Sequence, residues 1–324
     1  MNRQLTVVMY HYVRRLKNAR YPEIKGLELG LFVEQLKYMR KHYNVVSMED
    51  VLAARIDNTA LPEKPLLLTF DDGYAEHFTH VYPLLKKFGI QGSFYVPAKA
   101  VLKHQVLDVN KIHFILAACH STDALINSLK HELERHQQHY ALATFDGYFA
   151  EFAVANRFDT KEVIFIKRML QHALPEDLRN AIADKLFEQH LNINEDAFAR
   201  ELYMDRYQLE QLVRDGMHVG CHGYDHYWWN KLSPDALSTE LEQSMGFMAS
   251  LGCDMNNWTA CYPNGSSSDE VVATLEKQGC KLALTTEVGV ADLTQNHPLL
   301  IPRLDTNDLP KEASAEPNHW YEKA

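Results

Sequence analysis

The chain has 324 residues, of which 46% are hydrophobic and 23% charged, and its net charge is −10 with histidine neutral. This composition is that of a globular protein with enough residues for one large core or two smaller ones. The acidic balance and the lack of a dense Lys/Arg block argue against a nucleic-acid partner, and no apolar run reaches the length of a membrane span.

Residues 5–13 predict the first strand. The apolar run is too short and too soon interrupted for a secretory signal. His11 follows its apolar part, where it either hydrogen-bonds a nearby carbonyl or borders an active site, since such sites lie at the carboxyl ends of parallel strands. A helix is predicted around 31–39 from its apolar spacing, and another after Ser47, a good N-cap.

The five cysteines are odd in number and show no CxxC spacing. They indicate neither a disulfide framework nor a thiolate zinc site. With no export signal recognised, we expect a cytoplasmic protein.

A short apolar run, Leu66–Phe70, predicts a strand buried on both faces of a parallel sheet. It leads directly into Asp71 and Asp72, and Gly73 allows a sharp turn. Asp-Asp-Gly is also ordinary turn chemistry. Two adjacent carboxylates are costly, however, unless a cation neutralises one of them or a proton is shared, so a functional interpretation needs a partner elsewhere in the chain.

A βαβ unit follows, with a helix over 81–88 and a strand over 92–96, and it favours a parallel α/β barrel or sheet. Residues 101–204 then become poor in glycine and rich in amphipathic segments, which predicts a helical insertion. A lid over a substrate and a homo-oligomer interface are both compatible with it. Its histidines are scattered rather than set at a ligand spacing, and we expect none of them to bind metal: His104, His113, His120, His131, His136 and His139.

The α/β pattern resumes near residue 204, and a strand over 217–221 leads into His222-Gly223-Tyr224-Asp225-His226. If this backbone is helical, the two histidines share one face and can bind one metal ion. With Asp72 they would form a two-histidine, one-carboxylate site with positions open for water and substrate. Asp71 would remain free to act as a base.

The last third continues the alternation. Helices are predicted over 237–248 and 270–278, and strands over 258–262, 282–285 and 299–301. The Pro263-Asn264-Gly265 turn follows one of these strands, so backbone N–H groups near Asn264 would face a developing oxyanion.

Thr69-Phe70-Asp71-Asp72-Gly73 followed by His222-x-x-x-His226 resembles the first two motifs of the NodB-type polysaccharide deacetylases. Tyr262-Pro263-Asn264-Gly265 stands where that family has an Arg-x-Pro-aromatic-Gly loop. The resemblance covers roughly residues 5–100 and 205–305. It implies an α/β fold, a distorted (β/α) barrel of about seven units, as one catalytic domain over 1–324 with the insertion inside it.

The resemblance also implies a reaction. A divalent ion, Zn²⁺ with Co²⁺ or Ni²⁺ as alternatives, would be held by Asp72, His222 and His226, and Asp71 would be the general base. The family's arginine is replaced by Cys261, and Arg303 either reaches the same carboxylate or pairs with Asp305 at the surface. The family's terminal histidine motif is not recognisable.

That departure leaves two candidates for the general acid, His11 and His297. We favour His11, because His297 is followed by proline in an expected loop. The predicted function is removal of an acetyl group from an N-acetylated sugar or glycan precursor in surface-glycan biosynthesis. The alternatives are hydrolysis of another C–N bond, such as a cyclic imide or ureide, and a catalytically silent glycan-binding protein.

Overall fold

The computed structural model describes residues 3–119 and 121–324. The described chain forms two compact units. One comprises residues 3–17, Gly26–Gln105 and Ala199–Ala324, and the other Asn18–Lys25 and Val106–Phe198 without His120. That the second unit is an insertion within one catalytic domain stays a prediction.

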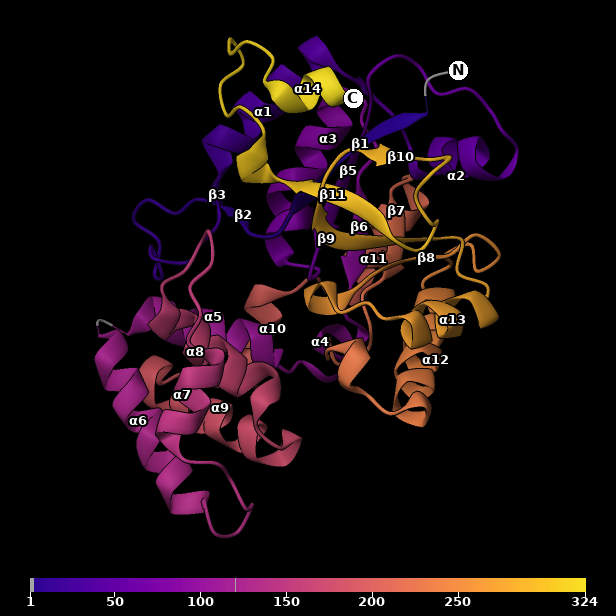
Figure 1. The fold of residues 1–324 in the computed structure, drawn as a ribbon. Coiled ribbons are helices and arrows are strands. Elements are labelled where there is room, and N and C mark those ends of the chain that lie inside the picture. The colour runs from indigo at the N-terminus through magenta and orange to yellow at the C-terminus, as the bar shows by residue number, and fades with distance from the viewer. Residues whose placement is uncertain (1–2, 120) are drawn as a thin grey trace. The chain divides into compact units, whose positions relative to one another are not determined.

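The first unit is a closed parallel barrel, which confirms the predicted fold class (Figure 1). Its strands within the described residues lie in the order β1-β11-β9-β8-β7-β6-β5, and the pairing of β1 with β5 closes it. They are β1 (Gln4–Tyr10), β5 (Pro65–Asp71), β6 (Ser93–Val96), β7 (His218–Cys221), β8 (Thr259–Cys261), β9 (Leu282–Val288) and β11 (Ile301–Asp305). Two further short strands pair with barrel strands: β10 (Ala291–Asp292) with β1, and β4 (Asn44–Val45) with β5. A separate two-stranded sheet is formed by β2 (Val13–Arg14) and β3 (Leu27–Glu28).

Helices accompany these strands. They are α1 (Leu29–His42), α2 (Met48–Ile56), η1 (His77–Val81), α3 (Tyr82–Phe88), α4 (Ala98–Lys103), α11 (Arg206–Arg214), η3 (Trp229–Lys231), α12 (Pro234–Ser250), η4 (Pro263–Gly265), α13 (Asp269–Lys277), η5 (Thr306–Asp308) and α14 (His319–Lys323). Ser47 caps α2 through a complete capping box with Asp50, as its position predicted.

Alternation along β5 determines what enters the barrel. Leu66, Leu68 and Phe70 pack in the cluster that contains the α1 side chains, whereas Leu67 packs with side chains of the other barrel strands. Because strand side chains alternate, Thr69 and Asp71 share the inward direction of Leu67. The strand therefore delivers Asp71 to the interior at the carboxyl end of the barrel.

The second unit is helical, as the amphipathic character of residues 101–204 predicted. Its helices are α5 (Asp108–Ala118), α6 (Thr122–His136), α7 (Phe145–Phe152), α8 (Lys161–Arg168), η2 (Met169–Ala173) and α9 (Glu176–Leu191), while α10 (Glu195–Leu202) crosses the boundary between the units. His120 lies outside the described residues. In the part of the chain that is described, no helix has both the length and the apolar character needed to cross a bilayer.

Several strand boundaries differ from the prediction; β9, for example, runs to Val288 rather than to 285. The first strand ends at Tyr10 rather than 13, and the last spans Ile301–Asp305 rather than 299–301. Pro302 looked like the end of that last strand, because proline lacks a backbone N–H. The strand continues through it with a register shift against β9 between Ile301 and Arg303. Arg303 is therefore part of the barrel wall.

Gly220 of β7 is expected to tolerate no side chain. A Cβ there would lie 2.4 Å from Cε1 of Tyr95, which is fully buried. We expect Gly220→Ala to destabilise the fold by about 1–3 kcal/mol through overpacking, measured by urea unfolding of metal-free protein. Gly246→Ala is the matched control, since a Cβ there meets nothing within 4 Å; it should be neutral or stabilising by up to about 1 kcal/mol. Equal effects of the two substitutions would contradict the packing argument.

Candidate metal centre

Asp72, His222 and His226 converge at the carboxyl end of the barrel strands. Oδ1 of Asp72 lies 3.3 Å from Nε2 of His222 and 3.3 Å from Nε2 of His226. The two Nε2 atoms are 3.2 Å apart. All three side chains are buried. The structure thus brings together the three residues predicted as metal ligands, and their role as ligands stays a prediction.

The spacing of these atoms fits a tetrahedral ion. Bonds of about 2.0–2.1 Å to nitrogen and carboxylate oxygen place tetrahedral ligand atoms about 3.3 Å apart, close to the observed separations. Among the described residues, Oδ1 of Asp72 is buried without a hydrogen-bond partner, and burying an unsatisfied carboxylate oxygen is costly. A divalent ion at this point would satisfy it.

The histidine loop, residues 222–226, is not helical. The backbone that follows β7 has no helical segment over these residues, and Gly223 and His226 have positive φ angles of 78° and 61°. The helical condition under which an i, i+4 pair shares one face is therefore not met. A tight turn brings the two rings together instead, with their centroids 4.6 Å apart.

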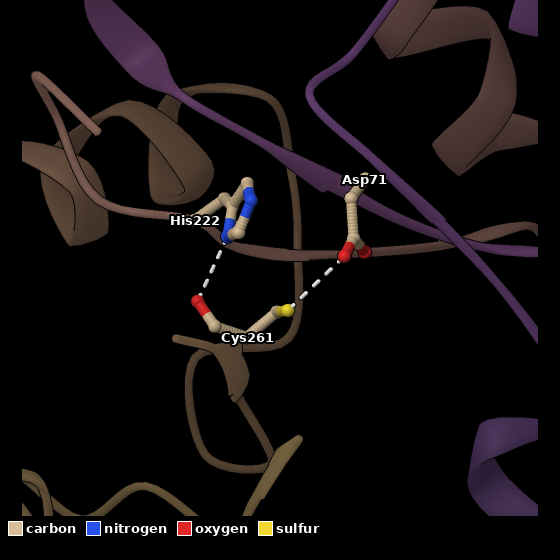
Figure 2. Close-up of side chains that lie close together, drawn as sticks. All are labelled: Asp71, His222 and Cys261. Atoms are coloured by element: carbon tan, nitrogen blue, oxygen red, sulfur yellow. Dashed lines mark hydrogen bonds between the residues drawn. The ribbon is translucent and has the colours of Figure 1, made fainter. Parts of the chain in front are cut away.

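Two neighbours fix the ligand orientations. Nδ1 of His222 lies 2.8 Å from the carbonyl oxygen of Cys261 (Figure 2). Because a carbonyl only accepts, Nδ1 carries a proton, and Nε2 is the nitrogen whose lone pair a metal ion would use once the ring is neutral. The Tyr74 hydroxyl donates to Oδ2 of Asp72, which leaves Oδ1 toward the histidines.

The pKa values of the two histidines are shifted in opposite directions. Burial lowers the pKa of His222, but Cys261 and Asp72 raise it by more than burial lowers it. The resulting pKa is well above the usual value. Burial dominates at His226 and its pKa is lowered. Burial raises the pKa of Asp72, yet the nearby His222 and His226 rings hold it well below its usual range. A cation would therefore compete with protons at these rings.

Asp71 is held by Arg303 rather than by the ligand set. Nη1 and Nη2 of Arg303 donate to Oδ1 and Oδ2 of Asp71 at 3.0 and 2.8 Å, and Nε donates to the Thr285 carbonyl. Arg303 is 1% exposed, so a surface pair with Asp305 is excluded. Burial raises the pKa of Asp71, but the guanidinium, His222 and His11 lower it to about 2.

Cys261 stands at the sequence position where the resemblance predicts an arginine. Figure 2 shows its thiol facing Asp71 and its carbonyl facing His222. Its Sγ lies 3.4 Å from Oδ2 of Asp71 and 3.0 Å from Nη2 of Arg303. Asp71, His222 and Cys261 thereby form a second group with metal-ligand chemistry, overlapping the first. Burial raises the pKa of the Cys261 thiol, so it is protonated at neutral pH.

The other predicted site residues differ in position. Nε2 of His11 lies 3.9 Å from Oδ2 of Asp71, and its side chain is 40% exposed, so it reaches both the site and solvent. Asn264 follows β8 in a left-handed conformation with φ of 55°. His297 is 3.3 Å from Glu276, which it contacts at the surface. The preference for His11 over His297 agrees with these positions, and both roles stay predictions.

Sequence reasoning missed two residues that support the site. Tyr74 orients Asp72, and its place directly after Asp71-Asp72-Gly73 was a signal that was not used. His77 lies on η1, and its Nε2 is 2.7 Å from the carbonyl oxygen of His11. Burial lowers its pKa to about 4, so the ring is neutral and donates this hydrogen bond. Its spacing gave no sign of that contact.

Two proteins with curated names share parts of this sequence. A putative polysaccharide deacetylase of Bacillus subtilis, YxkH, is 24% identical over 153 residues, which cover 45% of this chain and 53% of that protein. The poly-beta-1,6-N-acetyl-D-glucosamine N-deacetylase of Escherichia coli K12 is 41% identical over 56 residues, 17% of this chain and 8% of that protein. The chain thus spans about half of the first and less than a tenth of the second.

Solved structures share the fold. The Streptococcus pyogenes deacetylase PplD in complex with acetate has a TM-score of 0.56 at 17% identity, covering 93% of this chain and 92% of that one. IcaB from Ammonifex degensii has a TM-score of 0.56 at 18% identity, covering 94% and 93%. At these identities the likeness establishes the fold alone.

The polysaccharide deacetylase family model matches residues 58–141 and 179–283, more than half of the chain. The first matched segment contains Asp71 and Asp72, and the second contains both histidines and Cys261. The chain therefore belongs to the polysaccharide deacetylase family.

Proposed function

We propose that the protein is a metal-dependent deacetylase that hydrolyses the acetamide of an N-acetylated sugar or glycan precursor. One observation carries the proposal. Three ligand atoms converge at 3.2–3.3 Å, and a second carboxylate, Asp71, lies beside them with its own cationic partner. A protein that only binds glycans has no need for that second carboxylate.

Asp72, His222 and His226 would hold the ion, and we propose Zn²⁺, which suits two imidazoles and one carboxylate. When bound, a divalent ion polarises an amide carbonyl and lowers the pKa of a bound water to about 7. The family is metal-dependent, and the ligand atoms fit such an ion. The choice of zinc over cobalt or nickel is part of the proposal.

Asp71 would accept the proton of the attacking water. Its pKa of about 2 keeps the carboxylate ionised at neutral pH, and the two hydrogen bonds from Arg303 fix its orientation. His11, which faces both Asp71 and solvent, would return a proton to the leaving amine. A backbone N–H near Asn264 would stabilise the oxyanion.

Several finer statements stay proposals. The name of the Escherichia coli relative points to N-acetylglucosamine polymers, and we extend that substrate class to this chain as part of the proposal. A place in surface-polysaccharide biosynthesis, a cytoplasmic location and assembly through the helical segment are likewise predictions.

Acetate release tests the reaction directly. Metal-stripped protein would be incubated with N-acetylhexosamines, nucleotide-linked N-acetyl sugars, β-1,6-linked N-acetylglucosamine oligomers and chitin oligomers, with Zn²⁺, Co²⁺ or Ni²⁺ added back. We expect metal-dependent acetate from at least one substrate. If one equivalent of metal binds and none of them releases acetate, the deacetylase proposal is contradicted, and cyclic imides and ureides are the next substrates.

Asp71→Asn separates catalysis from metal binding. The amide cannot accept a proton, so we expect turnover to fall by about 10²- to 10⁴-fold. Bound metal, measured by elemental analysis, should stay at the wild-type level because Asp71 is outside the ligand set. His226→Ala serves as the opposite control and should lose metal and turnover together. Wild-type turnover in Asp71→Asn would remove Asp71 from the mechanism.

Arg303→Met tests the ionisation of Asp71 through the pH dependence of kcat/KM. Without the guanidinium, burial is the main remaining influence and raises the pKa of Asp71. The carboxylate is then protonated as pH falls through this higher value, so the acid limb should move to higher pH. Arg303→Lys keeps a positive charge and should move it less. Identical acid limbs in wild type and both variants would show that Asp71 protonation does not limit the rate.

A further inference from the structure

We infer that Glu240 is the positioning residue for the two histidine ligands, acting through the backbone of the histidine loop. Glu240 lies on α12, far from the loop in sequence and outside the ligand set. The inference rests on the metal site proposed above, and it assigns a task to a buried carboxylate that the reaction itself does not use.

The Glu240 carboxylate binds two consecutive peptide groups of the loop. Its Oε1 accepts from the N–H of Tyr224 at 2.9 Å and from the N–H of Asp225 at 2.8 Å. Glu240 is 5% exposed, and burial raises its pKa to about 7. In its ionised form its hydrogen bonds are charge-assisted and roughly twice as strong as neutral ones. One oxygen therefore holds the middle of the segment that separates the histidines.

The opposite edge of the same segment is also fixed. The carbonyls of Gly223 and Tyr224 accept from the N–H groups of Ala98 and Lys99 at 3.1 and 3.0 Å. Lys99 also forms an ion pair with the side chain of Asp225. The loop is thus held from α12 on one side and from α4 on the other, although it has no helical hydrogen bonds of its own.

Gly223 and Glu240 depend on each other sterically. A Cβ at position 223 would lie 2.8 Å from Oε1 of Glu240 and 3.1 Å from Nε1 of Trp229. Gly223 also has φ of 78°, which a side chain would strain. The carboxylate therefore packs against Gly223, which has no side chain to collide with it, next to His222.

Loss of these hydrogen bonds is expected to lower the affinity of the site for metal. The residues between the ligands set the 3.2 Å separation of the two Nε2 atoms, and the partly buried N–H groups of Tyr224 and Asp225 would lose their acceptor. Mutating residues that orient metal ligands from behind typically costs 10- to 100-fold in metal affinity. A purely structural role for Glu240 would lower stability without changing metal affinity or the coordination of the ion.

The experiment measures Zn²⁺ affinity by chelator competition, and the visible spectrum of the Co²⁺-loaded protein, for Glu240→Met, Glu240→Gln and Glu240→Asp. Glu240→Met removes the acceptor, and we expect a 10- to 100-fold loss of affinity and an altered cobalt spectrum. Glu240→Gln keeps an acceptor oxygen and should restore most of the affinity. Glu240→Asp withdraws the oxygen by one methylene and should fall between them, and it keeps the test available if the methionine variant does not fold.

Two controls separate the possible failures. Glu242→Met makes the same substitution at an exposed position of α12 and should leave affinity unchanged. His222→Ala should abolish tight binding, and if it binds zinc as well as wild type, the proposed metal site itself is wrong. If His222→Ala behaves as expected but folded Glu240→Met or Glu240→Asp keeps wild-type affinity and the wild-type cobalt spectrum, the positioning role of Glu240 is overturned.

Discussion

Two carboxylates buried side by side at the end of β5 are the constraint on which the site depends. Asp71 and Asp72 are adjacent and almost fully buried, so each needs its own positive partner. Arg303 serves Asp71 through two hydrogen bonds. Asp72 has Tyr74 on one oxygen and the two histidines near the other. This division keeps one carboxylate free of the ligand set and directs the other toward an ion.

Barrel geometry brings these groups together from distant parts of the sequence. Alternation directs Asp71 inward from β5, and the same alternation directs His218, Gly220 and the following His222 inward along β7. Gly220 is small because Tyr95 crosses the interior beside it. Arg303 of β11 donates hydrogen bonds both to Asp71 and to the Cys261 thiol. The arginine thus arrives from a strand other than the one that the resemblance suggested.

Much of this arrangement could be predicted from the sequence, and the parts that could not be predicted have physical reasons. Alternation of strands and helices predicted a parallel α/β barrel or sheet, and the family resemblance implied the barrel. The adjacent aspartates after a buried strand marked the end of the strands where the site lies. The contact of Arg303 was left open because the last strand was predicted to end before Pro302. The strand continues through this proline, at a register shift. The non-helical histidine loop was missed because i, i+4 spacing does not specify the backbone between. Glu240 acts through hydrogen bonds that no spacing rule predicts.

X-ray absorption spectroscopy of the zinc-loaded protein tests the central claim most directly. Within residues 3–119 and 121–324, two overlapping groups of side chains have metal-ligand chemistry, Asp72-His222-His226 and Asp71-His222-Cys261. The account predicts a shell of nitrogen and oxygen at about 2.0–2.1 Å with two imidazoles and no sulfur. A sulfur ligand at about 2.3 Å would place the ion on Cys261 and Asp71. It would contradict the account, because Asp71 would then be a ligand and no longer a free base.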